Sequence, residues 1–114
     1  MRRKWTDAAK ETLRTLKYRR QAVDSMKKLL EAKEDPEVRE RLRQVETSVM
    51  AAERALASLT GEQADILKDF YIERGDGYMD ELCRKYRCAR STVYRLKSQA
   101  LSAFSMTMFG SDGF

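Results

Sequence analysis

The sequence predicts an all-α fold, in which a long antiparallel helical hairpin is followed by a domain of three shorter helices. Two observations support this prediction. Apolar residues recur at helical spacing, and helix-start signals interrupt the pattern at Asp35 and Thr60. We expect the hairpin to cover residues 1–58, the second domain residues 59–109, and a frayed tail residues 110–114.

The charges of the 114-residue chain are distributed unevenly. Lys and Arg outnumber Asp and Glu by 23 to 18, which gives a formal net charge of +5. Residues 1–33 contain eleven basic and four acidic side chains, residues 60–81 two and seven, and residues 82–101 six and none. This segregation predicts two basic surfaces, each suited to a polyanion or an acidic protein.

Composition also excludes several classes of protein. An apolar content of 42% is sufficient for a packed core, but no run of eighteen apolar residues is present, and the basic N-terminus lacks the apolar segment of a signal peptide. We therefore expect a cytoplasmic protein without a membrane partner. Cys83 and Cys88 match no zinc signature in a chain without histidine, so we interpret both as small core side chains and predict no metal or other cofactor.

The first helix is predicted from a heptad seam. Apolar or small residues alternate at steps of four and three, with Thr12 and Arg19 as polar exceptions. The seam consists of Trp5, Ala9, Thr12, Leu16, Arg19, Val23, Met26 and Leu30. It ends at the segment EDPE, where Asp35 can cap a new helix and Pro36 suits the first helical position.

The second helix repeats this alternation and must run back along the first, because the connection between them is short. Its seam consists of Val38, Leu42, Val45, Val49, Ala52, Leu56 and Leu59. The seams then pair Leu30 with Val38, Met26 with Leu42, Val23 with Val45, Leu16 with Ala52 and Ala9 with Leu59, although a slip by one heptad is left open. The length of the first helix predicts an elongated molecule.

The apolar face of the hairpin is wider than the seam itself. Leu13, Leu29 and Met50 lie beside it. A two-helix hairpin buries only one stripe on each helix, so it needs a third surface. We favour a second copy of the hairpin, in a homodimer, over the second half of the same chain.

Three shorter helices are predicted after Leu59. Thr60 and Gln63 form a capping-box pattern at the start of the first, which buries Ile66, Leu67 and Phe70 and ends near Gly75. The second has about nine residues, with an apolar side made of Met79, Leu82, Cys83 and Tyr86. After a turn of about three residues, the third begins near Arg90. Its inward residues are Val93, Leu96, Ala100, Leu101 and Phe104.

The last two of these helices have the features of a helix-turn-helix. The major groove of DNA admits one helix, which must show polar side chains to the base edges while its back packs on the preceding helix. The side chains expected to face DNA are Arg84, Arg87, Arg90, Ser91, Thr92, Tyr94, Arg95 and Lys97. Burial of Arg90, Tyr94 and Arg95 together, or their engagement by neighbouring carboxylates of the same fold, would overturn this prediction.

This part of the chain carries a family resemblance. The run LTGEQADILKDFY…DELCRKYRCARSTVYRLKSQALSAF resembles the DNA-binding region 4 of bacterial sigma factors. The matching positions are Leu59, Glu62, Ile66, Leu67, Phe70, Tyr71, Glu81, Leu82, Ser91, Thr92, Val93, Ala100 and Leu101. The resemblance implies a module that reads a promoter element upstream of the start site and can contact RNA polymerase.

The chain departs from the family pattern at three positions around the turn. Cys83 stands where the family usually has Ala, Arg87 where it has Gly, and Ala89 where it has Ser. At Arg87 the turn either differs in detail from the family pattern or bears the strain of a left-handed residue other than Gly, which costs about 1 to 2 kcal/mol. The loss of an N-cap oxygen at Ala89 costs about 1 kcal/mol.

The chain has no counterpart of the sigma-factor domain that melts the start site. A long helical segment followed by a single region 4-like domain resembles the small phage and prophage transcriptional regulators of the ArpU type. This resemblance implies a sequence-specific regulator whose partners are double-stranded DNA and, as a further candidate, RNA polymerase. The basic first helix is then either a solvated face or a second contact to DNA phosphates or polymerase.

Two other functions are left open by the sequence. A phage DNA-packaging subunit of the small-terminase kind would also join DNA-binding and oligomerisation helices, but in a ring. A pure interaction protein would use the hairpin alone and bind no DNA. We do not expect an enzyme, because the chain lacks His, a nucleophile elbow and a phosphate loop, and the GDG segment at residues 75–77 lacks calcium ligands. The carboxylates of Asp65, Asp69 and Glu73 are expected on an exposed acidic face.

Overall fold

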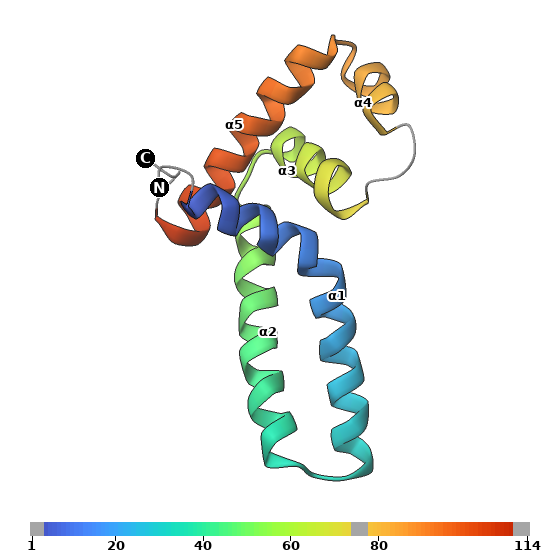
Figure 1. The fold of residues 1–114 in the computed structure, drawn as a ribbon, viewed down its shortest axis with the longest axis vertical. Helices are drawn as coiled ribbons and strands as arrows, with labels where there is room; N and C mark the ends of the chain where they lie inside the picture. Colours follow the sequence, from blue (N-terminus) through green and yellow to red (C-terminus); the bar gives the residue numbers. More distant parts are fainter. Residues whose placement is uncertain (1–3, 74–77, 111–114) are drawn as a thin grey trace.

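The computed structural model describes residues 4–73 and 78–110 of the chain. Its elements are α1 (Lys4–Ala32), α2 (Pro36–Ala57), α3 (Gly61–Leu67), the π-helix η1 (Lys68–Ile72), α4 (Tyr78–Tyr86) and α5 (Arg90–Phe109) (Figure 1). Every regular element within these two ranges is helical, which confirms the predicted all-α class. The predicted helix end near Gly75, the GDG segment and the tail after residue 110 lie outside the described residues.

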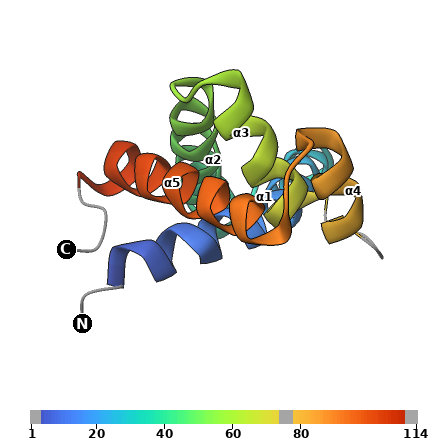
Figure 2. The ribbon, with the colours of Figure 1, turned by 90° about the horizontal axis from the view of Figure 1, so that it is seen from above.

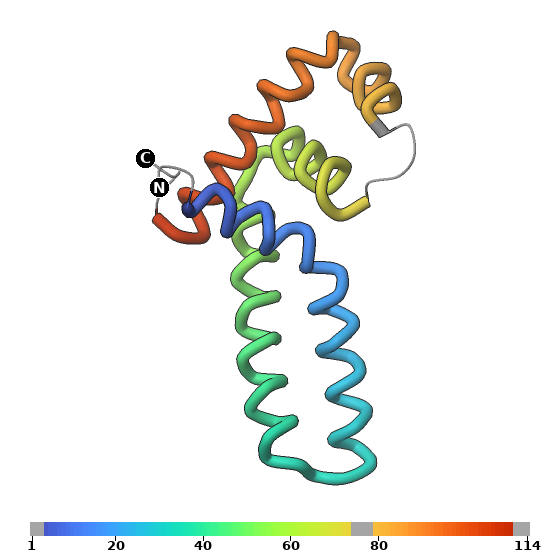
Figure 3. The backbone as a smooth tube through the Cα atoms, in the orientation of Figure 1, coloured from blue at the N-terminus to red at the C-terminus, as the bar shows by residue number. Residues whose placement is uncertain are grey.

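α1 and α2 lie side by side and run in opposite directions (Figures 1 and 3). The predicted seams supply the buried residues of this pair, among them Leu16, Val23, Val45, Val49 and Ala52. Arg19, a polar exception in the seam, is half-buried and donates a hydrogen bond to the hydroxyl of Ser48 on α2. The charged end of Arg19 therefore has a polar partner at a position where the heptad pattern expects an apolar side chain.

A row of ion pairs follows one edge of the α1–α2 pair. The pairs are Arg20–Glu53 at 3.0 Å, Lys27–Glu46 at 3.1 Å and, with the charges exchanged, Arg39–Glu34 at the turn. Successive pairs are one heptad apart in each helix. A slip by one heptad would bring Lys27 opposite Arg39 in one direction, or Glu34 opposite Glu46 in the other, so the charges favour the observed register.

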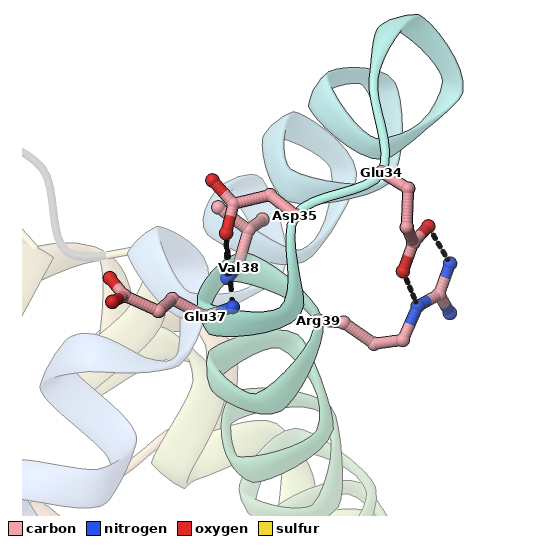
Figure 4. Close-up of polar contacts among 5 residues, drawn as sticks. All are labelled: Glu34, Asp35, Glu37, Val38 and Arg39. Atoms are coloured by element: carbon pink, nitrogen blue, oxygen red, sulfur yellow. Dashed lines mark hydrogen bonds and ion pairs between the residues drawn. The ribbon is translucent and has the colours of Figure 1, made fainter.

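The start of α2 is capped as the sequence predicts (Figure 4). Asp35 is extended, and its carboxylate accepts hydrogen bonds from the backbone N–H groups of Glu37 at 3.0 Å and Val38 at 3.4 Å. Pro36 occupies the first helical turn, where a missing N–H leaves no helical hydrogen bond unmade. Two of the unpaired N–H groups at this helix end are thus satisfied locally.

α1 changes direction within its first half, so its N-terminal part leaves the axis of the α1–α2 pair (Figures 1 and 3). Two threonines in this half donate hydrogen bonds to carbonyl groups one turn earlier. Thr12 Oγ1 lies 2.8 Å from the carbonyl oxygen of Ala8, and Thr15 Oγ1 lies 2.8 Å from that of Glu11. Because such bonds compete with the backbone ladder and bend helices, we attribute the change of direction to these two hydroxyls.

α3 begins with the predicted capping box. Thr60 Oγ1 accepts from the N–H of Gln63 at 3.2 Å, and the N–H of Thr60 donates to Gln63 Oε1 at 3.4 Å. Ile66, Leu67 and Phe70 are buried, as predicted. The helix does not continue as a regular α-helix, however, because residues Lys68–Ile72 form a π-helix that the sequence pattern did not predict.

α5 lies between the first half of α1 and α3 (Figure 2). Ala9 and Leu13 of α1, together with Ala100 and Phe104 of α5, have no exposed surface. Buried residues from all six elements, the five α-helices and η1, form one cluster. One half of α1 therefore packs on the C-terminal helices, whereas the distal ends of α1 and α2 project away from them (Figure 1).

The described residues extend over 53 × 32 × 23 Å, so the molecule is elongated, as the length of the first helix predicts. The α1–α2 turn and the α4–α5 turn lie at opposite ends of the long axis (Figure 1). Near the start of α1, the ring of Trp5 stacks on that of Phe109 at the end of α5, with centroids 5.3 Å apart. The first and last helical turns are therefore in contact.

Candidate nucleic-acid interface

α4 ends in a Schellman motif, a hydrogen-bonded cap in which glycine usually takes the left-handed position. The N–H of Arg87 donates to the carbonyl of Arg84 at 3.3 Å, and the N–H of Cys88 donates to the carbonyl of Cys83 at 3.1 Å. Arg87 has φ 53°, so of the two outcomes that the sequence left open, the turn bears the strain of a left-handed residue other than glycine. The associated strain is about 1 to 2 kcal/mol.

Cys83 and Cys88 occupy the two positions of this motif that commonly make an apolar contact. Both side chains are half-buried and pack against the core cluster. Both are free cysteines. Their surroundings agree with the interpretation of both residues as small core side chains.

α5 begins without a side-chain cap. Ala89 is extended, with φ −74° and ψ 162°, and its carbonyl accepts the N–H of Val93 at 3.1 Å. Because alanine has no side-chain acceptor, the first N–H groups of α5 lack the local partner that Asp35 gives to α2. The positive end of this helix is consequently open to an external acceptor.

The structure places most of the residues predicted to face DNA on the surface around the α4–α5 turn. The exposed ones are Arg84, Arg87, Arg90, Ser91, Tyr94 and Arg95. Thr92 and Lys97 are half-buried. On the opposite side of α5, Val93, Ala100, Leu101 and Phe104 are buried, as predicted.

Arg90 differs from the prediction in one respect, because it is paired with a carboxylate of the same fold. Its Nη2 donates to Asp80 Oδ1 of α4 at 3.1 Å, and this contact raises the pKa of the Arg90 guanidinium. Both side chains remain about two-thirds exposed, at 67% and 72%. Solvent-exposed ion pairs are weak and exchange readily, so the pair orients Arg90 without removing it from the surface.

Tyr94 and Lys97 belong to an aromatic cluster with Phe70 of η1. The rings of Tyr94 and Phe70 have centroids 5.9 Å apart, and Lys97 Nζ lies 5.5 Å from the Phe70 centroid and 6.0 Å from that of Tyr94. Tyr94 is 48% exposed, so one side of its ring remains open to solvent. Lys97, in contrast, lies partly along these rings and offers less of its side chain to a ligand than the sequence predicted.

Lys97 also faces basic residues of α1. Burial lowers the pKa of its ammonium, and the neighbouring charges of Lys10 and Arg14 lower it further. The sequence shows an excess of basic residues in the first helix, but its pattern places none of them beside Lys97. That placement depends on the direction of α1 beyond its bend, which no local sequence pattern encodes.

Three acidic residues of this half, Asp69, Glu73 and Glu81, lie together between η1 and α4. Lys85 Nζ is 2.9 Å from Asp69 Oδ2, and together with Glu73 and Glu81 these residues line a shallow polar hollow between η1 and α4. The Asp69 carboxylate raises the pKa of the Lys85 ammonium. Within residues 4–73 and 78–110, no three His, Cys, Asp or Glu side chains are grouped so as to hold a metal ion.

Tyr86, the last residue of α4, lies beside this acidic surface. Its hydroxyl is buried and has no hydrogen-bond partner among the residues that the structure describes. Burial raises the pKa of the phenol. A buried hydroxyl without a partner is a local cost to the fold.

Comparison with known proteins gives no assignment. The chain matches no protein-family model, no curated protein and no solved structure. None of the helices in the described ranges is both long enough and apolar enough to cross a membrane.

Proposed function

We propose that the chain is a sequence-specific DNA-binding regulator of transcription, cytoplasmic and of phage or prophage origin. In this proposal α4 and α5 form a helix-turn-helix of the sigma region 4 type, at the end of a molecule whose α1–α2 pair is a helical arm. The start of α5 enters the major groove, and α4 packs behind it.

One observation carries the proposal. The first turns of α5 lie at one end of the long axis (Figure 1), and their exposed side chains, including Arg90, Ser91 and Arg95, are basic or polar. α5 contains no Asp or Glu. Its buried side, by contrast, is apolar and fixed by the core. A rigid helix with one apolar and one cationic side, protruding at its N-terminal end, meets the geometric requirement for reading a groove.

The turn supports the same proposal through its chemistry. Arg87 is exposed in a left-handed conformation that glycine would adopt without strain. What arginine offers at this position, and glycine does not, is a positive charge. The open N–H groups at the start of α5 suit a phosphate oxygen. Arg90 can exchange Asp80 for a base edge or a phosphate, because the present pair is solvent-exposed.

Two further partners belong to the proposal. The resemblance to sigma region 4 implies a contact with RNA polymerase. The arm has exposed Leu29 and Met50, whose burial would favour a second copy of the chain. Native mass spectrometry tests this part: a dimer is the expected result, a monomer contradicts homodimerisation, and a ring favours the DNA-packaging alternative.

The test of DNA recognition begins with selection of a preferred duplex from a random pool by the full chain. Arg90→Ala and Arg95→Ala are each expected to weaken binding to that duplex by about ten- to a hundredfold and to affect random duplex much less. Arg41→Ala, which removes an exposed Arg far away on α2, is the matched control and should bind like the unmodified chain. Asp80→Asn, which frees Arg90, should retain or increase affinity.

Two results would overturn the proposal. The first is a selection that enriches no sequence. The second is a pair of variants, Arg90→Ala and Arg95→Ala, that bind the selected duplex as tightly as Arg41→Ala does.

A further inference from the structure

The cations of α1 fall into two groups with different surroundings. In the distal half, Arg20 and Lys27 are paired with Glu53 and Glu46 of α2. In the proximal half, beyond the bend, α1 lies along α5 instead of α2 (Figure 2). Because α5 contains no acidic residue, it offers no carboxylate to the basic residues of α1.

Lys10 and Arg14 are the proximal residues whose charges act on Lys97 of α5. Arg14 Cζ lies 5.8 Å from the ring centroid of Tyr71, and Lys97 Nζ lies 5.5 Å from that of Phe70. The two rings are themselves adjacent, with centroids 5.9 Å apart. The side chains of α1 and α5 therefore meet over one aromatic cluster.

The charges at this meeting point are poorly balanced. Lys10 Nζ has a carboxylate 4.0 Å away, that of Asp7, which is 68% exposed and lies on the same helix. Neither Arg14 nor Lys97 forms an ion pair with any other described residue. The lowered pKa of Lys97 is consistent with this imbalance, because burial and two neighbouring cations both disfavour its charged form.

We propose that Lys10, Arg14 and Lys97 form a second contact surface for DNA phosphates, which extends the interface from α5 onto α1. The inference rests on the proposed function of α5. Clustered cations that a fold neutralises incompletely are offset most directly by a polyanion, and DNA presents phosphates on both sides of the groove that α5 would enter. This surface contributes affinity rather than sequence preference, since phosphates carry no base information.

The experiment compares the salt dependence of DNA binding. The double variant Lys10→Gln/Arg14→Gln removes two candidate phosphate contacts. The matched control, Lys28→Gln/Lys33→Gln, removes two exposed charges at the distal end of the arm. Each phosphate contact contributes about 0.9 to the slope of log affinity against log salt concentration, so the double variant should lower that slope by about 1 to 2 while the control leaves it unchanged.

Two additional measurements separate charge from folding. The double variant should have a thermal midpoint equal to or above that of the unmodified chain, because it removes like-charge repulsion. Lys97→Gln, measured separately, should lower the slope by about 1. In all these variants the ratio of affinities for selected and random duplex should remain unchanged.

The possible failures are distinguishable. If Lys10→Gln/Arg14→Gln and Lys97→Gln keep the slope of the control while Arg95→Ala still loses sequence preference, the second surface is wrong and the proposed function stands. Such a result would direct attention to an acidic protein as the partner of α1. If the unmodified chain binds no duplex DNA, both proposals fail together.

Discussion

The α1–α2 arm and the α4–α5 end are both helical, but they differ in how well their residues follow local structural preferences. In the arm, Asp35 caps α2, the seam is buried and the charges on one edge are paired. At the α4–α5 end, Arg87 is left-handed, Ala89 gives no cap and the Tyr86 hydroxyl lacks a partner in the described structure. These three departures from local preference all lie around the α4–α5 turn.

This difference indicates that the residues at the α4–α5 turn are not those that would make the fold most stable. Substitutions that would remove the strain at Arg87 or cap α5 at Ala89 are single-residue changes, and neither position is buried. Positions at which a fold departs from local preference are often functional. The contrast between the two regions is open to direct measurement.

The largest expected effect concerns Leu13, which joins α1 to the C-terminal helices. Leu13 is 0% exposed, so Leu13→Ala should lower the free energy of unfolding by about 2 to 5 kcal/mol, measured by urea denaturation followed by circular dichroism. Tyr18→Ala, on the same helix but at a position 68% exposed, is the control and should change it by less than about 0.5 kcal/mol. Equal effects of the two variants would mean that α1 does not bury Leu13 against the C-terminal helices.

The second prediction removes the strain at the turn. Arg87→Gly should raise the free energy of unfolding by about 1 kcal/mol, because glycine adopts positive φ without the steric cost. Arg84→Gly places the same residue three positions earlier, inside α4, and should instead lower it by about 1 kcal/mol. A loss of stability in Arg87→Gly comparable to that of Arg84→Gly would contradict the left-handed turn.

The third prediction concerns two variants, one that removes the N-cap of α2 and one that adds an N-cap to α5. Asp35→Ala removes an observed cap and should cost about 1 kcal/mol, whereas Ala89→Ser adds one at an extended residue and should gain a similar amount. Thermal unfolding of the two variants and of the double variant measures both effects. If Ala89→Ser is neutral, the first N–H groups of α5 already have acceptors that the structure does not reveal.

The smallest effect concerns the exposed pair at the arm's turn. The hydrogen bond from Arg39 lowers the pKa of Glu34 below its usual 4.5. A lowered folded-state pKa stabilises the fold above the unfolded pKa, and the contribution is lost as pH falls through the folded value. Carboxyl NMR titration should show the Glu34 pKa rising in Arg39→Gln and unchanged in Arg41→Gln. If Arg39→Gln leaves the pKa of Glu34 unchanged, the Arg39–Glu34 pair does not form in solution and cannot help to fix the register of α1 and α2.

The elements of this fold were predictable where the signal is local. The seams of α1 and α2, the Asp35 cap and the Thr60–Gln63 box depend on residues a few positions apart, and the structure has each of them. Local rules sufficed in these places because the interacting groups are neighbours in sequence.

The site was less predictable because its surroundings come from distant segments. Lys97 was predicted to face solvent, but it is half-buried against the Phe70 and Tyr94 rings and lies within the influence of the Lys10 and Arg14 charges of α1. Leu13 was assigned to a dimer face, and the bend of α1 buries it within the chain instead. The Arg90–Asp80 pair likewise joins two helices whose relative placement no periodicity determines. The π-helix at residues 68–72 could not be predicted, because the spacing of apolar residues there is that of an ordinary α-helix.

The stacking of Trp5 on Phe109 makes the contact between the first turn of α1 and the last turn of α5 observable by fluorescence. Trp5 is the single tryptophan of the sequence, and its indole stacks on the last ring of α5. Separation of these helical turns would move the indole into water and shift its fluorescence emission to longer wavelength. The molecule thus carries an intrinsic optical probe at the seam between its beginning and its end, one that requires no attached label.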